Sequence, residues 1–97
     1  NHDALLQIVD LMLEDTKKAL ADKDITMELS EDAKKFLLDK GTDIKYGARP
    51  LRRAIQRYLE DALSDMILRG ELQNGQKVMV TTNEEKLLFT VINEPSN

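Results

Sequence analysis

The sequence predicts an α+β domain with three helices and a small, mostly antiparallel sheet of about three strands. Two observations predict this class. Apolar residues recur at helical spacing in three segments, and three shorter segments have the alternation or the composition of strands. The order along the chain is helix, strand, helix, helix, strand, strand, which favours a small sheet covered by helices on one side.

The first helix is predicted from about Asp3 to Asp22, because its apolar residues share one face and charged residues lie between them. Residues 24–29 follow, alternating polar and apolar side chains as a strand with one buried face does. The apolar residues of the helix face are Leu5, Ile8, Val9, Met12, Leu13 and Leu20.

A second helix is predicted to begin after Ser30 and to run to about Lys40. Serine is a favoured N-cap, and acidic residues at 31 and 32 suit the first turn of a helix. Gly41 is expected to end this helix as the C′ residue in the left-handed conformation.

The third and longest helix is predicted from Pro50 to Arg69. Proline is favoured at the first position of a helix, and Gly70 is expected to end the helix. The apolar stripe contains Leu51, Ile55, Tyr58, Leu59, Ala62 and Met66, whereas Arg49, Arg52, Arg53, Arg57 and Glu60 gather on the other side. The helix is therefore expected to have one core face and one basic face.

Two strands are predicted at the end of the domain, Lys77 to Thr82 and Lys86 to Ile92. Asn74-Gly75 is a turn signal before the first strand, and residues 83–85 are short enough to join the pair as a hairpin. The folded domain is expected to cover residues 1–92, with 93–97 as a flexible tail.

The composition limits the function classes. The 97 residues suffice for one compact domain, and cysteine is absent, which excludes disulfides and thiolate chemistry. No apolar run has the length of a membrane span, and no signal-peptide pattern is present, so an intracellular, cytoplasmic protein without a membrane partner is expected. A net charge of −4 argues against general affinity for nucleic acid.

The arginines at the start of the third helix are the most informative feature of the sequence. Arg49, Arg52 and Arg53 crowd a helix end that already carries partial positive charge, and this arrangement favours an anion such as phosphate nearby. Gly47 and Ala48 have small side chains, which let a ligand or another backbone approach Arg49 closely.

A solvated helix face is the alternative explanation of these arginines. Arg57 has Asp61 four residues later, and Arg53 could reach Glu60, so surface ion pairs would account for both. Arg49 fits this alternative less well than the others, because it precedes Pro50 outside the helix.

No catalytic residue and no metal ligand are predicted. No pair of carboxylates has a spacing suited to acid–base chemistry, and Ser64 and Thr16 have no recognisable base partner. Neither G-x-x-x-x-G-K-[ST] nor G-x-G-x-x-G occurs, so a nucleotide would have to be held mainly by another domain.

The run Tyr46-Gly47-Ala48-Arg49-Pro50-Leu51-Arg52-Arg53-Ala54-Ile55 resembles the sensor-2 motif of AAA+ proteins. Residues 8–13, 28–30, 60–64 and 68–70 are also similar to the C-terminal small domain of the second ATPase module of Clp-family unfoldases. Residues 52–55 together with 60–61 are most similar to ClpC-type members, and next to ClpB-type members.

The resemblance implies that Arg49 reaches the γ-phosphate of ATP and that Gly47, Ala48 and Pro50 shape the site. It implies a large ATPase domain that holds ATP with Mg²⁺. It further implies packing of this domain against the large domains of the same chain and of the adjacent subunit in a homo-hexamer, with Arg52, Arg53 and Arg57 as interface candidates. The isolated chain is then expected to be a monomer without ATPase activity of its own.

A regulatory module that binds nucleic acid through the basic helix face is the second functional hypothesis. The negative net charge and the few aromatic residues, Phe36, Tyr46, Tyr58 and Phe89, argue against it. The two hypotheses differ in the partner of the basic face.

Overall fold

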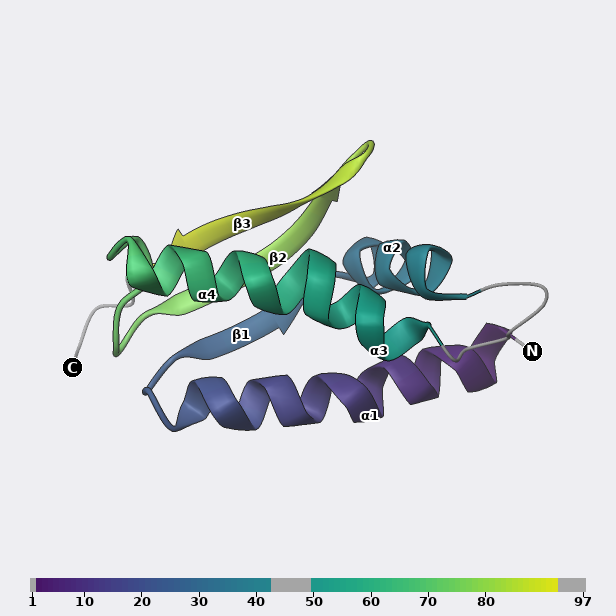
Figure 1. Ribbon diagram of the computed structural model, residues 1–97, viewed down its shortest axis with the longest axis horizontal. Helices are drawn as coiled ribbons and strands as arrows, with labels where there is room; N and C mark the ends of the chain where they lie inside the picture. The colour runs from purple at the N-terminus through teal and green to yellow at the C-terminus, as the bar shows by residue number, and fades with distance from the viewer. Residues whose placement is uncertain (1, 43–49, 93–97) are drawn as a thin grey trace.

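The computed structural model describes residues 2–42 and 50–92, and within these ranges the elements follow in the predicted order (Figure 1). The elements are α1 (His2–Ala21), β1 (Thr26–Leu29), α2 (Glu31–Gly41), α3 (Leu51–Ala54), the π-helical segment η1 (Ile55–Glu60), α4 (Asp61–Leu68), β2 (Lys77–Asn83) and β3 (Lys86–Ile92). Since α3, η1 and α4 are one continuous helical run, the predicted three helices are confirmed.

The sheet has the strand order β1-β2-β3, with β2 in the middle. The predicted hairpin is confirmed, because β2 and β3 are antiparallel with Asn83 opposite Lys86. In contrast, β1 pairs parallel to β2, with Thr26 opposite Lys77. The sheet is therefore mixed, because the helices between β1 and β2 carry the chain back to the end where β1 started.

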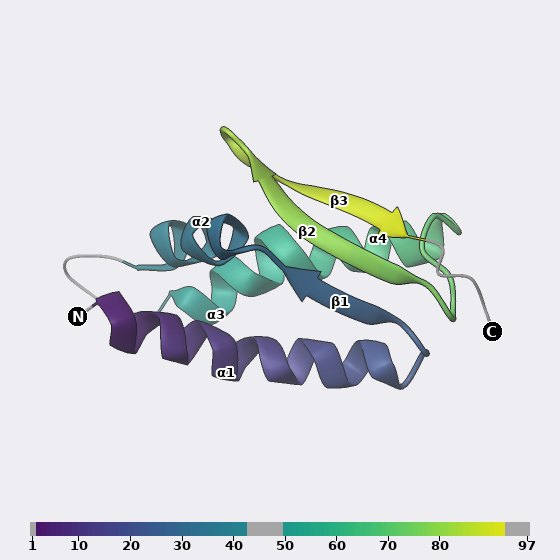
Figure 2. The same ribbon diagram turned by 180° about the vertical axis from the view of Figure 1, so that it is seen from behind.

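The helices lie on one side of the sheet, as expected. The run α3-η1-α4 crosses in front of the strands in Figure 1, whereas the strands face the viewer in Figure 2. Along β2 the side chains of Val78 and Val80 are buried, while those of Lys77, Met79 and Thr81, which alternate with them, are only half-buried. Alternation along the strand thus assigns the two valines to the helix-covered face and the other three residues to the open face.

The core is aliphatic, as the scarcity of aromatic residues predicts. It unites residues of every helix and of all three strands within the described part of the chain. Its members include Val9, Leu13 and Leu20 of α1, Met27 of β1, Leu37 and Leu38 of α2, Leu51, Ile55, Leu59 and Leu63 of the helical run, and Val78, Val80 and Leu87 of the hairpin.

The helical run contains a π-helical segment that the sequence did not reveal. Its buried row is Leu51, Ile55, Leu59 and Leu63, with a constant spacing of four residues. In an α-helix each step of four residues turns the side chain about 40° further round, so such a row drifts off one face. The wider turn of residues 55–60 offsets this drift. Leu63 is consequently buried, whereas the predicted Ala62 is only half-buried.

The predicted N-cap is confirmed, and the predicted role of Gly41 is wrong. Ser30 Oγ accepts a hydrogen bond from the Ala33 amide at 3.1 Å. Gly41 is the last residue of α2, and among the described glycines only Gly70 (+77°) and Gly75 (+89°) have positive φ. Glycine is required at position 41 because an added Cβ would lie 2.6 Å from the Leu51 Cα. A close approach between two helices, and not the left-handed conformation, explains this residue.

An ion pair lies at the open face of the sheet. Glu28 on β1 and Lys77 on β2 are joined by a salt bridge. The hydrogen bond and the charge of Lys77 lower the pKa of the Glu28 carboxyl below its ordinary value, and Lys17 contributes a smaller lowering. The pair thus connects the parallel strand to the centre of the sheet.

Candidate functional site

Pro50 is the one residue of the predicted nucleotide site that the structure describes; Gly47, Ala48 and Arg49 lie outside the described residues. Pro50 has φ −78° and ψ 3°, and α3 begins at the next residue. Its carbonyl oxygen accepts a hydrogen bond from the Ala54 amide at 3.0 Å. Pro50 is therefore the N-cap residue and not the predicted first residue of the helix, which is Leu51.

The start of α3 is packed closely against the end of α2. Besides its 2.6 Å approach to the Leu51 Cα, a Cβ at position 41 would lie 3.1 Å from the Ala54 Cβ. Leu51 is fully buried, and Ala54 is 5% exposed. The backbone that follows Arg49 is thus held by the core on one side and by α2 on the other.

The three interface candidates Arg52, Arg53 and Arg57 are all exposed. The ion pairs within residues 2–42 and 50–92 join other residues: Lys34 to Asp10, Arg69 to Asp65, and Lys77 to Glu28. The local pairs of Arg57 with Asp61 and of Arg53 with Glu60, which a solvated face would provide, are not among them.

Lys40, Arg53 and Arg57 surround a small hollow that we call the basic pocket. Its volume is about 120 Å³, and Pro50, Ala54 and Tyr58 complete its lining. Two cations lie near aromatic rings: Lys40 Nζ is 5.6 Å from the centroid of Phe36, and Arg57 Cζ is 5.6 Å from that of Tyr58. The two rings meet edge to face, with their centroids 5.6 Å apart. Cation–π attraction favours these positions of the two cations.

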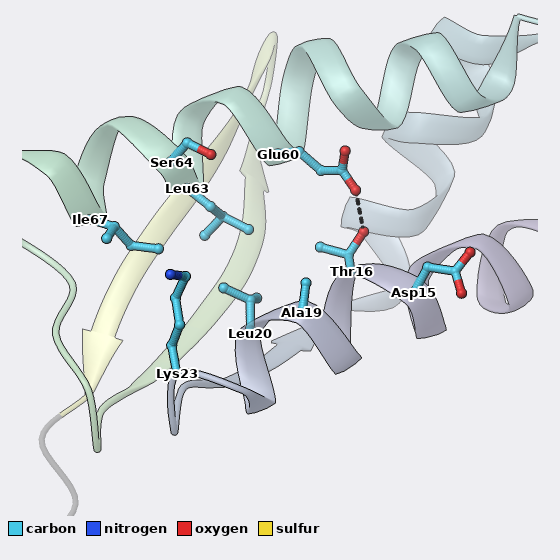
Figure 3. A pocket seen from close by; sticks show the side chains of 9 residues that line it. All are labelled: Asp15, Thr16, Ala19, Leu20, Lys23, Glu60, Leu63, Ser64 and Ile67. Atoms are coloured by element: carbon cyan, nitrogen blue, oxygen red, sulfur yellow. Dashed lines mark hydrogen bonds between the residues drawn. The ribbon is translucent and has the colours of Figure 1, made fainter.

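A second hollow lies between α1 and the helical run (Figure 3). It has a volume of about 300 Å³ and is lined by Asp15, Thr16, Ala19, Leu20, Lys23, Glu60, Leu63, Ser64 and Ile67. Thr16 Oγ1 donates a hydrogen bond to Glu60 Oε2 at 2.6 Å at one end of it. Glu60 therefore contacts α1, and its predicted place on the basic face is wrong.

The described residues contain neither a cluster of metal ligands nor a membrane-spanning helix. In residues 2–42 and 50–92, no group of three or more His, Cys, Asp and Glu side chains is arranged to hold a metal ion. None of the helices in this part of the chain is long and apolar enough to cross a membrane.

Sequence reasoning found the arginines of the basic pocket but missed Lys40 and the aromatic pair. Lys40 is four residues from Phe36 on α2, a helical spacing that the sequence contains. The contact between α2 and η1 at this place is a tertiary contact, which no local sequence pattern predicts. The Thr16 partner was missed for the same reason, since Glu60 is 44 residues away.

Comparison with known proteins identifies similar chains. Residues 1–80 match the family model described as the C-terminal, D2-small domain, of ClpB protein. Chaperone protein ClpB of Rhizobium meliloti (strain 1021) is 48% identical over 82 residues, covering 84% of this chain and 9% of that protein. Chaperone protein ClpB of Agrobacterium fabrum (strain C58 / ATCC 33970) is 47% identical over 89 residues, covering 92% and 10%.

A ClpC-type protein is similar as well. Negative regulator of genetic competence ClpC/MecB of Bacillus subtilis (strain 168) is 42% identical over 80 residues, covering 82% of this chain and 10% of that protein. The sequence resemblance named both types, and of these three relatives the two ClpB proteins have the higher identity. The chain spans about a tenth of the length of these curated relatives.

Proposed function

The chain belongs to the family of C-terminal D2-small domains of ClpB, and we propose that it is the nucleotide-sensing lid of a Clp-type ATPase, with Arg49 as the sensor. In this proposal the whole protein is an ATP-dependent chaperone or unfoldase of the cytoplasm. The chain alone has no ATPase activity, because a large domain holds ATP and Mg²⁺.

The residues of this chain fit one end of the nucleotide. A guanidinium stays charged and presents a planar fork of donors to phosphate oxygens, so Arg49 is suited to the γ-phosphate. Gly47 and Ala48 leave room for close approach, and Pro50 fixes the backbone that follows. The sequence offers no phosphate-binding glycine loop, which is consistent with a nucleotide held mainly elsewhere.

The close packing of Leu51 against Gly41 is the observation that carries the proposal. The residue after Arg49 is Pro50, and the residue after that is fully buried against α2. A change in the position of the Arg49 side chain would therefore move α2 and the helical run together. A sensor must be coupled to a rigid body in this way if a local contact is to change the orientation of a domain.

The contact of Arg49 with the γ-phosphate gives the orientations of the domain different free energies. Arg49 binds the phosphate in one orientation and loses its partner after hydrolysis. Only such a differential contact can shift a two-state equilibrium. In this proposal the domain packs against the large domain of the same chain and against that of the adjacent subunit in a homo-hexamer. Arg52, Arg53 and Arg57 lie at these interfaces.

The test is Arg49→Ala in the Clp-type ATPase that carries this domain. Loss of one charge-assisted phosphate contact, worth about 1.5 to 3 kcal/mol, should lower the ATPase rate by about tenfold or more and reduce unfolding of a substrate protein. The melting temperature of the 97-residue chain should stay unchanged. Arg69→Ala is the matched control, because Arg69 is exposed and paired with Asp65.

An ATPase rate equal to that of the unmodified protein would contradict the sensor role. A lower melting temperature of the Arg49→Ala chain would indicate a structural role instead.

A further inference from the structure

The basic pocket joins three cations from two separate elements, Lys40 from α2 and Arg53 and Arg57 from the helical run. We propose that it is a docking site for an acidic segment of a partner polypeptide, which inserts a glutamate or aspartate side chain between these cations. The inference deepens the interface role proposed above for Arg53 and Arg57, and it rests on that role.

Two of the three cations contact aromatic rings of this chain. Lys40 lies over the ring of Phe36, Arg57 lies over the ring of Tyr58, and the two rings contact each other at an interplanar angle of 87°. Long cationic side chains normally lose much rotamer freedom when they bind. Because the aromatic pair already restricts two of the three cations around the pocket, less of that loss remains for binding.

Within residues 2–42 and 50–92 no ion pair uses the pocket cations, although Lys40 also borders a neighbouring hollow that Asp39, Glu84 and Glu85 line. The chain as a whole has a net charge of −4, so this positive patch is local. A complementary acidic surface on a partner would be attracted to this patch and repelled by much of the remaining surface.

The size and lining of the pocket favour a carboxylate side chain over a nucleotide. Small-molecule sites have volumes of roughly 300 to 1,000 Å³, and this pocket has about 120 Å³. Pro50 and Ala54 present apolar atoms, and proline has no N–H to donate to a phosphate. An apolar wall beneath three cations suits the methylene stem of a glutamate whose carboxylate reaches the guanidinium groups.

The experiment titrates the ¹⁵N-labelled 97-residue chain with capped hexaglutamate at low salt and follows the backbone amides by NMR. The largest shifts should occur around Lys40, Arg53 and Arg57. Arg53→Gln with Arg57→Gln should raise the dissociation constant by about 5- to 10-fold, because two charge-assisted contacts are lost. Both residues are exposed, so the variant should keep the fold, and its amide spectrum shows whether it does.

The matched control is Arg52→Gln, which removes an exposed arginine of the same helix that does not line the pocket, and it should leave the affinity unchanged. The proposal is overturned if hexaglutamate does not bind, or if Arg52→Gln weakens binding as much as Arg53→Gln does. It is also overturned if inorganic phosphate or duplex DNA, at equal ionic strength, displaces the peptide from these amides. None of these results depends on Arg49, so failure here leaves the sensor role separately testable.

Discussion

Thr16 Oγ1 donates a hydrogen bond to Glu60 Oε2 at 2.6 Å, which joins α1 to the last residue of the π-helical segment. Thr16 is only 6% exposed, and no other polar or charged residue in the described part of the chain is buried. A buried hydroxyl needs a partner, and an ionised acceptor makes a stronger hydrogen bond than a neutral one. The contact therefore fixes α1 and the helical run relative to each other.

Thr16→Val tests this contact, because valine has nearly the same shape but no hydroxyl. Loss of the hydrogen bond should lower the free energy of unfolding by about 1 to 2 kcal/mol, because the carboxylate of half-buried Glu60 loses its hydrogen-bond donor. Urea denaturation measures the change. Thr26→Val is the control, because Thr26 is exposed on β1 and should change the stability little. An equal loss in both variants would contradict the role of the hydrogen bond.

Gly41→Ala should destabilise the protein even though alanine is the better helix former. The new Cβ would lie 2.6 Å from the Leu51 Cα, a backbone atom that cannot move aside alone. We expect a loss of about 1 to 3 kcal/mol, measured by thermal or urea denaturation. Lys35→Ala is the control, because Lys35 is exposed on the same helix and its replacement should change the stability little. A gain in stability for Gly41→Ala would show that the helices do not approach so closely.

Lys77→Gln should raise the pKa of the Glu28 carboxyl toward the ordinary glutamate value of 4.5. Because the pKa of Glu28 is lowered in the folded protein, its contribution to stability is present above the ordinary value. It is lost as the pH falls through the lowered value. NMR titration of the Glu28 carboxyl measures the shift directly. Lys86→Gln, on β3 away from the pair, should leave the Glu28 pKa unchanged, and equal pKa values in both variants would exclude Lys77 as the cause.

The features that could be predicted from the sequence are those that depend on near neighbours. Ser30 caps a helix that begins at the next residue, and Gly70 follows the helix that it ends. The hairpin depends only on the short segment between β2 and β3. Glu84 in this turn has φ +49°.

What could not be predicted depends on contacts between distant segments. The need for glycine at position 41 comes from its close approach to Leu51, ten residues further along the chain. The hydrogen-bond partner of Thr16 is Glu60. No local pattern in the sequence predicts the π-helical segment. Leu63, which follows it, is buried in the core, and Glu60 at its end contacts α1. At the candidate site, the arginine-rich helix start could be predicted from the sequence. The contribution of Lys40 to the basic pocket could not, because Lys40 lies on a different helix.

The parallel pairing of β1 with β2 has a consequence for the order in which the domain can fold. The β2–β3 hairpin forms from residues close in the chain, but β1 meets β2 only after α2 and the whole helical run have been placed between them. Closing so long a loop costs chain entropy before any strand contact offsets it, and such contacts slow folding. A chain that ended before Lys77 would leave β1 without its neighbour and the core without Val78 and Val80. We therefore expect the first strand to gain its stability only once the last segments of the domain have been synthesised.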